Sequence, residues 1–250
     1  MNWDQLTRPD IDVLDRNIPV ILPVAAIEQH GLHLPLATDR MIVEFFCQQL
    51  NQDIPEKVLI LPVMSVGCSE HHMDFPGTLT LQHDTFQQQA EDILGSVAAH
   101  GFKNLLIYNS HGGNLAISQV IVEHFGHRHP ACRIVLATWW KIVADALFEL
   151  NETGEGGVGH AGEFETSLMM LIAPDLVHHD KIEEKKNQQS FDWANGDMLR
   201  GPRASLYRSM KAMTPIGVFG DVRKHSAEKG QKITDLAVEG LRKIVLDLHG

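Results

Sequence analysis

The chain has 250 residues, 44% of them hydrophobic, and a formal net charge of −11 at pH 7. That length and apolar content suffice for a sizeable core, and we expect a single domain over residues 1–250. The acidic balance argues against a nucleic-acid surface, which would need clustered Lys and Arg. The apolar run at 18–27 is short and contains two prolines, so neither a signal peptide nor a membrane span is indicated and a cytoplasmic location is expected. Three widely spaced cysteines argue against a disulfide framework or a cysteine zinc site.

In chain order, β-branched apolar runs predict buried strands at 20–27, 58–66, 104–109 and 133–138. Helical spacing of apolar residues predicts helices at 39–50, 84–100, 114–125 and 233–248. Thr38 and Asn114 are the expected N-caps of the first and third of these helices. The polar segment 181–201 is expected to be a loop. Because strands alternate with helices, we predict an α/β fold with a mostly parallel sheet covered on both faces, whose ligands bind at the carboxyl ends of the strands.

The segment that follows the first strand carries Glu28, His30 and Asp39. If the strand continues to His30, Glu28 and His30 point to the same face and start about 6–7 Å apart. This spacing is wide for one ion and suits two ions about 3.5–4 Å apart, with Asp39 able to bridge them. Taken alone, the same residues also fit a surface Glu and His followed by an aspartate at a helix start. Whether these residues bind metal therefore depends on which side chains other segments place at the same edge of the sheet.

His111 follows the third predicted strand and is itself followed by Gly112 and Gly113. Glycines at such a turn let the backbone approach a neighbouring group closely. A histidine on a turn needs no special role, but this one lies on the same predicted edge as Glu28 and His30. That placement favours a metal ligand.

A third polar cluster, His160, Glu163 and Glu165, opens an apolar helix. His160 and Glu163 are three residues apart and share a helix face. Glu163 and Glu165 differ by about 200° around a helix, so we do not expect both to bind one metal pair directly. Acidic residues are also favourable at a helix start without any metal.

Three other patterns carry no function. The run 154–159 matches a dinucleotide-binding fingerprint but follows a helical stretch instead of a strand. Cys68 has no neighbour in sequence that would clearly lower the pKa of its thiol, and a serine nucleophile elbow is absent from the sequence.

His71 and His72, before Phe75, belong to a loop that either lines a substrate pocket or is simply exposed.

Together, the polar segments resemble the creatininase family of metal-dependent amidohydrolases. The segments that carry the resemblance occur in order along the chain: Glu28-Gln29-His30-Gly31 with Pro35 and Asp39, Phe75-Pro76-Gly77-Thr78, His111-Gly112-Gly113-Asn114, and 160–167. The resemblance implies a three-layer α/β/α fold, a homo-oligomer that is usually a hexamer, and a site for two divalent ions of Zn, Mn or Fe. It also implies that Glu28 and His111 bind one ion, that His30 binds the other and that Asp39 binds both.

Creatininase itself has a glutamate ligand two residues after the histidine of the third strand, where this chain has Gly113. We predict that Glu163 replaces this missing ligand. Trp140 resembles an active-site tryptophan of the family. A second tryptophan, which closes over creatinine, falls near Gly156 here, so creatinine is not the expected substrate.

We therefore predict a dinuclear hydrolase that cleaves the C–N bond of a small cyclic or linear amide. His160 is the predicted proton donor to the leaving nitrogen, and Glu165 is expected to orient His160 or the attacking water. His71, His72 and Trp140 are the predicted substrate-binding residues. The family also includes a formamidopyrimidine deformylase, a peptidase and an inosose hydrolase, so a peptide or carbocyclic sugar substrate stays open. A metal-binding protein without turnover is the alternative that Gly113 motivates.

Overall fold

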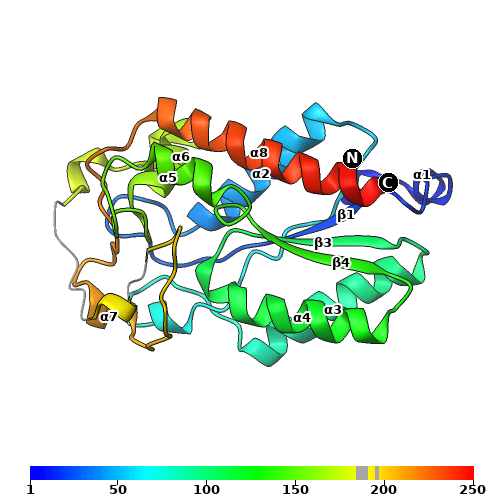
Figure 1. Cartoon of the computed structure of the whole chain (residues 1–250), viewed down its shortest axis with the longest axis horizontal. Helices are drawn as coiled ribbons and strands as arrows, with labels where there is room; N and C mark the ends of the chain where they lie inside the picture. The colour runs from blue at the N-terminus through cyan, green and yellow to red at the C-terminus, as the bar shows by residue number, and fades with distance from the viewer. Residues whose placement is uncertain (184–190, 195–196) are drawn as a thin grey trace.

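The centre of the fold is a parallel β-sheet. The computed structural model describes residues 1–183, 191–194 and 197–250, and in this part of the chain the sheet has four strands in the order β2-β1-β3-β4 (Figure 1). The strands are β1 (Val20–Val24), β2 (Leu59–Ile60), β3 (Asn104–Asn109) and β4 (Arg133–Thr138). Every residue of β1 and β3 is buried, as expected for central strands of a sheet that is covered on both faces.

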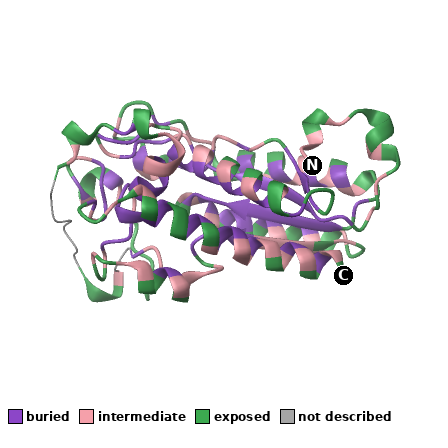
Figure 2. Cartoon of the chain, turned by 90° about the horizontal axis from the view of Figure 1, so that it is seen from above, coloured by how far each residue is buried: buried purple, intermediate pink, exposed green. Residues whose placement is uncertain are grey.

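Helices cover both faces of this sheet. On one face lie α2 (Thr38–Asp53), α5 (Ala144–Leu150), α6 (Glu163–Ile172) and α8 (Ala227–His249), and on the other lie α3 (His83–Ala99) and α4 (Leu115–Arg128). In Figure 2 the central strands appear as buried chain, whereas the helices around them mix buried and exposed residues. The fold is therefore the predicted three-layer α/β/α arrangement.

Side-chain alternation along the strands produces two separate cores. In β1, Ile21 packs with the α2, α6 and α8 side, whereas Val20 and Leu22 pack with the α3 and α4 side. In β3, Tyr108 belongs to the first core and Ile107 to the second. This follows from the two-residue repeat of a strand, which turns successive side chains to opposite faces.

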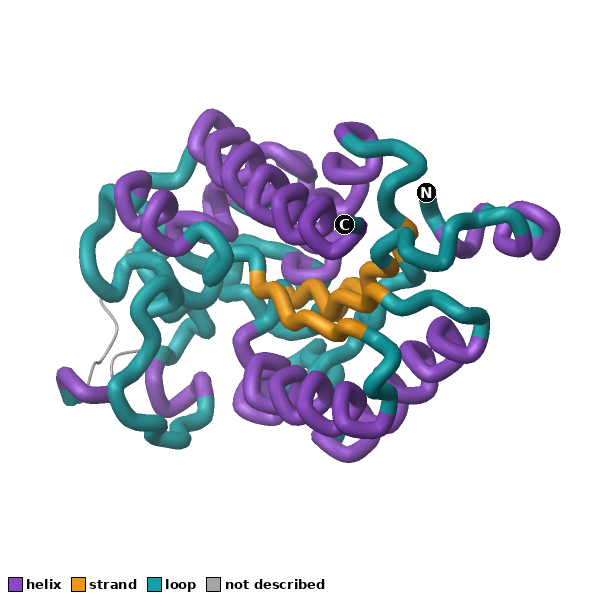
Figure 3. Tube along the Cα trace, turned by 45° about the vertical axis from the view of Figure 1, so that its right-hand side comes forward, coloured by secondary structure: helices purple, strands orange, loops and turns teal. Residues whose placement is uncertain are grey.

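Short helices complete the described elements and lie mainly in the connections. They are η1 (Trp3–Gln5), α1 (Arg8–Asp12), η2 (Glu70–His72), η3 (Gly112–Asn114), η4 (Pro174–Leu176), η5 (His179–Lys181), η6 (Asp192–Ala194) and α7 (Met210–Met213). Figure 3 shows that many of the loops lie together at one end of the sheet. In the described residues, no helix combines the length and the apolar character that a membrane crossing requires.

Several predicted boundaries were wrong. The first strand ends at Val24 and does not reach His30, and the second covers only two residues of the predicted 58–66. The helix predicted at 233–248 begins at Ala227, where the hydroxyl of Ser226 accepts a hydrogen bond from the backbone N–H of Lys229. Of the predicted loop 181–201, residues 184–190 and 195–196 lie outside the described residues.

Neither predicted N-cap side chain caps its helix. Thr38 lies inside α2, and its hydroxyl donates to the carbonyl of Pro35 at 2.7 Å. Asn114 does precede α4, but its amide binds the backbone of Cys68 and Ala25. Both side chains instead hold loops near the ends of the strands.

Candidate metal centre

A cavity of about 380 Å³ lies where the strands end, and the predicted polar residues converge on it. Glu28 follows β1, His111 follows β3, Trp140 follows β4, and Asp39 and Glu165 lie in the first turns of α2 and α6. The cavity is lined by eight of the residues predicted from the sequence: Glu28, Asp39, His71, His72, His111, Trp140, His160 and Glu165. His30 lies against this cluster and is fully buried.

Asp39 occupies the middle of the cluster. Its Oδ1 lies 3.3 Å from Nε2 of His30, and its Oδ2 lies 3.2 Å from Nδ1 of His111. The same His111 nitrogen lies 3.3 Å from Oε1 of Glu28, and His30 Nε2 lies 3.8 Å from Oε2 of Glu165. One carboxylate therefore faces two sets of potential ligands, one on each of its oxygens.

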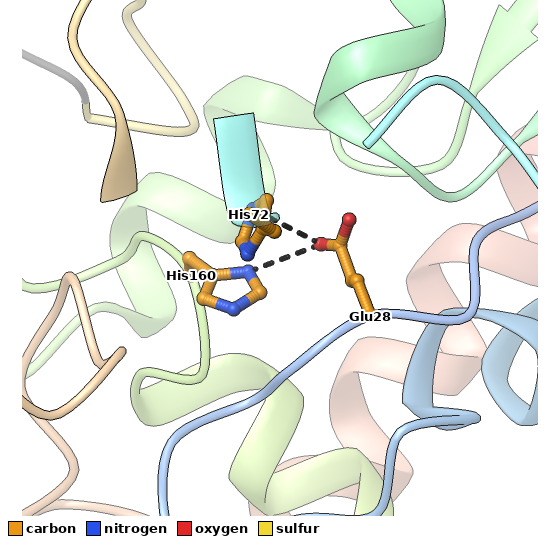
Figure 4. Close-up of side chains that lie close together, drawn as sticks. All are labelled: Glu28, His72 and His160. Carbon is orange, nitrogen blue, oxygen red and sulfur yellow. Dashed lines mark ion pairs between the residues drawn. The ribbon is translucent and has the colours of Figure 1, made fainter. Parts of the chain in front are cut away.

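Among the residues that the structure describes, three groups of side chains have ligand atoms close enough to share an ion. They are Glu28 with Asp39 and His111, His30 with His160 and Glu165, and Glu28 with His72 and His160. Figure 4 shows the third group, in which Oε1 of Glu28 lies 3.4 Å from Nε2 of His72 and 3.5 Å from Nδ1 of His160. Since the groups share members, the chemistry of each imidazole must decide between them.

Backbone carbonyls orient three of these imidazoles in the same way. His30 Nδ1 contacts the carbonyl of Glu28 at 3.1 Å, and His111 Nε2 contacts that of Cys68 at 3.1 Å. His160 Nε2 contacts the carbonyl of Gln29 at 2.6 Å. Each of these nitrogens therefore carries the proton, and the other ring nitrogen of each histidine faces the carboxylates. Metal-binding histidines show this arrangement, because the N–H that donates outward fixes the ring and leaves the second nitrogen as the ligand.

The buried carboxylates strongly perturb the protonation of the imidazoles. Burial alone would lower the pKa of His30, yet Asp39 and Glu165 raise it to about 9. Burial likewise opposes the charge on His111, but Glu28 and Asp39 raise its pKa well above the usual value. The cluster thus requires positive charge, which protons provide in the absence of a divalent ion and which such an ion would replace on binding.

Orphaned buried atoms provide a direct test of whether a metal fits. Within the described part of the chain, Oε2 of Glu28, Nε2 of His30 and Oδ2 of Asp39 are buried and make no hydrogen bond. Buried polar atoms in native proteins nearly always have a partner. A set of carboxylate and imidazole ligands without thiolates suits Zn, Mn or Fe, so these residues fit a divalent metal centre.

Glu163 does not reach this cluster, contrary to the prediction that it replaces the missing ligand. Its carboxylate accepts hydrogen bonds from the backbone N–H groups of Glu152 and Thr153 and from the Nζ of Lys229. Because α6 begins at Glu163, residues two apart lie about 200° apart around the helix. Glu165 therefore faces His30, while Glu163 faces α8.

Gly113 cannot be replaced by a ligand without rearrangement. A Cβ at this position would lie 2.1 Å from the carbonyl oxygen of Cys68 and 2.4 Å from Nε2 of His111. His71 also packs here, with its ring stacked on that of His111 at a centroid distance of 5.8 Å. The space that a side chain at position 113 would need is thus filled by two histidines and a carbonyl group.

The walls of the cavity are largely apolar away from the carboxylates. They are formed by Leu115, Trp140, Met198, Leu199, Met210, Met213 and Phe219. Lys141 and Arg200, both exposed, also line it, and the guanidinium of Arg200 lies over the ring of Phe148. A substrate in this cavity would therefore meet apolar surface and two cationic groups.

Comparison with known proteins places these features in a family. The creatininase family model, described as creatinine amidohydrolase, matches residues 4–245. Creatinine amidohydrolase of Pseudomonas putida is 28% identical over 240 residues, which cover 89% of this chain and 86% of that protein. The mycofactocin precursor peptide peptidase of Mycobacterium ulcerans (strain Agy99) is 28% identical over 228 residues, which cover 86% of this chain and 79% of that protein.

A solved structure described as "Creatininase Mn" superposes with a TM-score of 0.84 at 23% identity and covers 98% of this chain and 97% of its own. This likeness shows that the three-layer fold is shared. Because the family model matches nearly the whole length, and because both relatives are hydrolases by name, the chain belongs to the creatininase family of hydrolases.

Proposed function

We propose that this protein is a dinuclear metal hydrolase that cleaves the C–N bond of a small amide. The observation that supports it best is the position of Asp39, whose two oxygens face His30 and His111 on opposite sides. In this proposal Glu28, Asp39 and His111 hold one divalent ion, and His30, Asp39 and Glu165 hold the other. Glu165 thus replaces Glu163 as the acidic ligand of the second ion.

Bound divalent ions would supply a polarised substrate carbonyl and a water of lowered pKa. The chain itself supplies the proton transfer. The Nε2–H of His160 donates to the carbonyl of Gln29, so Nδ1 carries the free lone pair. The side chain of His160 is 12% exposed, whereas that of His30 is fully buried. We therefore assign to His160 a proton relay, in which Nδ1 takes a proton from the attacking water and gives it to the leaving nitrogen.

The cavity walls narrow the class of substrate. Trp140, Phe219 and the methionines favour an amide with an apolar substituent. Lys141 and Arg200 favour a substrate that also carries a carboxylate. His71 and His72 line the same cavity and remain proposed substrate contacts, although His72 also contacts Glu28. We further propose a single-domain chain in a cytoplasmic location and, from the family resemblance, a homo-oligomeric assembly such as a hexamer.

A second candidate is hydrolysis of a peptide. It is favoured by the Mycobacterium ulcerans relative, whose name describes a peptidase of a precursor peptide. The same metal ligands would serve, because the bond cleaved is again an amide. A short peptide with an apolar side chain and a free carboxylate would suit both the apolar walls of the cavity and its two cationic side chains.

The test combines metal content with a substrate screen. Plasma mass spectrometry is expected to find about two ions per chain in wild type. Asp39→Ala is expected to lose both ions, because Asp39 faces both sets of ligands. The loaded protein is then screened against cyclic amides, formamides and short peptides, each as a neutral and a carboxylate-bearing pair. Failure to bind any metal after reconstitution would contradict the hydrolase proposal, whereas bound metal without hydrolysis would favour a metal-binding protein without turnover.

A further inference from the structure

The side chain of Gln29 lies between two of the histidines that surround Glu28. It is buried, and its Nε2 lies 2.9 Å from Nδ1 of His72 and 3.0 Å from the carbonyl of Gly217. Its Oε1 accepts a hydrogen bond from the backbone N–H of Gly31 at 3.0 Å. We infer that Gln29 is a positioning residue that sets which ring nitrogen of His72 carries the proton, and thereby turns an N–H of His72 toward Glu28, so that His72 is not a metal ligand.

The orientation of the amide is fixed by its backbone partners. Gly217 offers only a carbonyl and Gly31 only an N–H at these contacts, so the amide nitrogen must face Gly217 and the amide oxygen must face Gly31. One of the two amide protons is then used by Gly217. The second is directed to His72, and Nδ1 of that ring must accept it.

An imidazole whose Nδ1 accepts a hydrogen bond carries its single proton on Nε2. In His72 this nitrogen lies 3.4 Å from Oε1 of Glu28. His72 therefore presents an N–H to the carboxylate and has no lone pair there to offer an ion. Of the three candidate groups, the one formed by Glu28, His72 and His160 is thereby excluded as a metal site.

The backbone of the same residue orients His160. The carbonyl of Gln29 accepts the Nε2–H of His160 at 2.6 Å. The amide nitrogen of Gln29 lies 3.2 Å from that ring nitrogen, but both of its protons are already used by His72 and Gly217. Gln29 thus orients two neighbouring imidazoles in opposite ways, since His72 turns its Nε2–H toward Glu28 while His160 turns its free Nδ1 toward the same carboxylate.

Gly217 provides a separate sign that this position is built for the glutamine amide. Its φ is +81°, and a Cβ there would lie 1.8 Å from Oε1 of Gln29. Only glycine combines this backbone conformation with the space for the amide. The position is therefore restricted both by backbone conformation and by contact with Gln29.

The test measures the ring nitrogens directly. Metal-free protein labelled with ¹⁵N-histidine is examined by NMR, with the His72 signals assigned by their loss in His72→Asn. In wild type, Nδ1 of His72 is expected to be unprotonated and Nε2 protonated. In Gln29→Glu, whose carboxylate can only accept, Nδ1 is expected to gain a proton. Thr78→Val is the matched control, because it removes only the acceptor of the Gln29 backbone N–H and should leave both nitrogens unchanged.

A metal titration adds a second readout. The neutral Gln29→Met is expected to weaken binding of Zn²⁺ by about 10-fold, the lower end of the usual effect of losing an outer partner of a metal ligand, because the N–H of His72 that faces Glu28 is then no longer fixed. Unchanged Zn²⁺ binding in Gln29→Met would overturn the inference, because the amide contacts would then not be needed at the metal centre. A protonated Nδ1 on His72 in wild type would also overturn it, and this result needs no variant to fold. Because the NMR measurement uses no metal and no substrate, it stands or falls independently of the proposed hydrolase function.

Discussion

Glu165→Gln is expected to lower the divalent-metal content from about two ions per chain to about one while the protein stays folded. Burial raises the pKa of Glu165 to about 7, which means that its carboxylate is poorly stabilised without a nearby cation. Oε2 of Glu165 lies 3.8 Å from Nε2 of His30, on the side of Asp39 away from His111. The backbone N–H of Ala161 donates to Oε2 of Glu165 at 2.6 Å. Glutamine, the neutral isostere, keeps an oxygen that can accept this hydrogen bond, so folding should be little affected.

Plasma mass spectrometry after equilibration with Zn²⁺ or Mn²⁺ measures this loss. Thermal unfolding provides a second measurement, because an ion present at 1,000 times its Kd stabilises a fold by about 4 kcal/mol. The variant should therefore retain only part of the rise in Tm that metal produces in wild type. Glu163→Gln is the matched control and should keep the full metal content. Two ions retained by Glu165→Gln would show that the second site is completed by another residue.

Much of this fold could be predicted from local sequence. The strands at 104–109 and 133–138 are bounded as predicted, because their apolar runs end at turn residues. Glu28, Asp39 and His111 come together because parallel strands end at one edge of a sheet, which needs no knowledge of long-range contacts. The convergence of these residues could thus be inferred from their positions after predicted strands.

The prediction that strand alternation turns Glu28 and His30 to the same face was wrong. β1 ends at Val24, so no strand alternation relates the two side chains. The backbone instead makes isolated bridges, from Ile27 to Leu79 and from His30 to Leu32 and Leu34. These bridges depend on how the following loop folds back, which residue spacing does not reveal.

Which of Glu163 and Glu165 faces the cluster of ligands depends on a contact with a residue far along the chain. Their separation around the helix was predictable, but which of them faces the cluster depends on where α6 lies against α8. Lys229, 66 residues after Glu163, is the group that takes up its carboxylate. The contacts of the Gln29 amide could not be predicted for a similar reason, because Gly217, which fixes this amide, is 188 residues away.

Glu163→Ala is expected to destabilise the protein by about 3–5 kcal/mol, the usual result of removing one partner of a buried ion pair. Glu163 is fully buried and Lys229 is 7% exposed. The loss would leave the Lys229 ammonium with only the exposed carboxylate of Glu152 and the carbonyl of Lys224 as partners. It would also free the backbone N–H groups of Glu152 and Thr153. The loop before α6 would thereby lose its attachment to α6 and α8. For a chain of this size, the midpoint of thermal unfolding should fall by roughly 10 °C.

The control for this prediction removes both charges. Glu163→Met combined with Lys229→Met should recover much of the lost stability, because apolar replacement of a buried ion pair is often close to neutral. Recovery should be incomplete, since the two backbone N–H groups stay without an acceptor. Metal content per folded chain should match wild type in both variants, because neither residue lies in a candidate ligand group. A Glu163→Ala protein of unchanged Tm that had lost metal would reverse our assignment of the two glutamates.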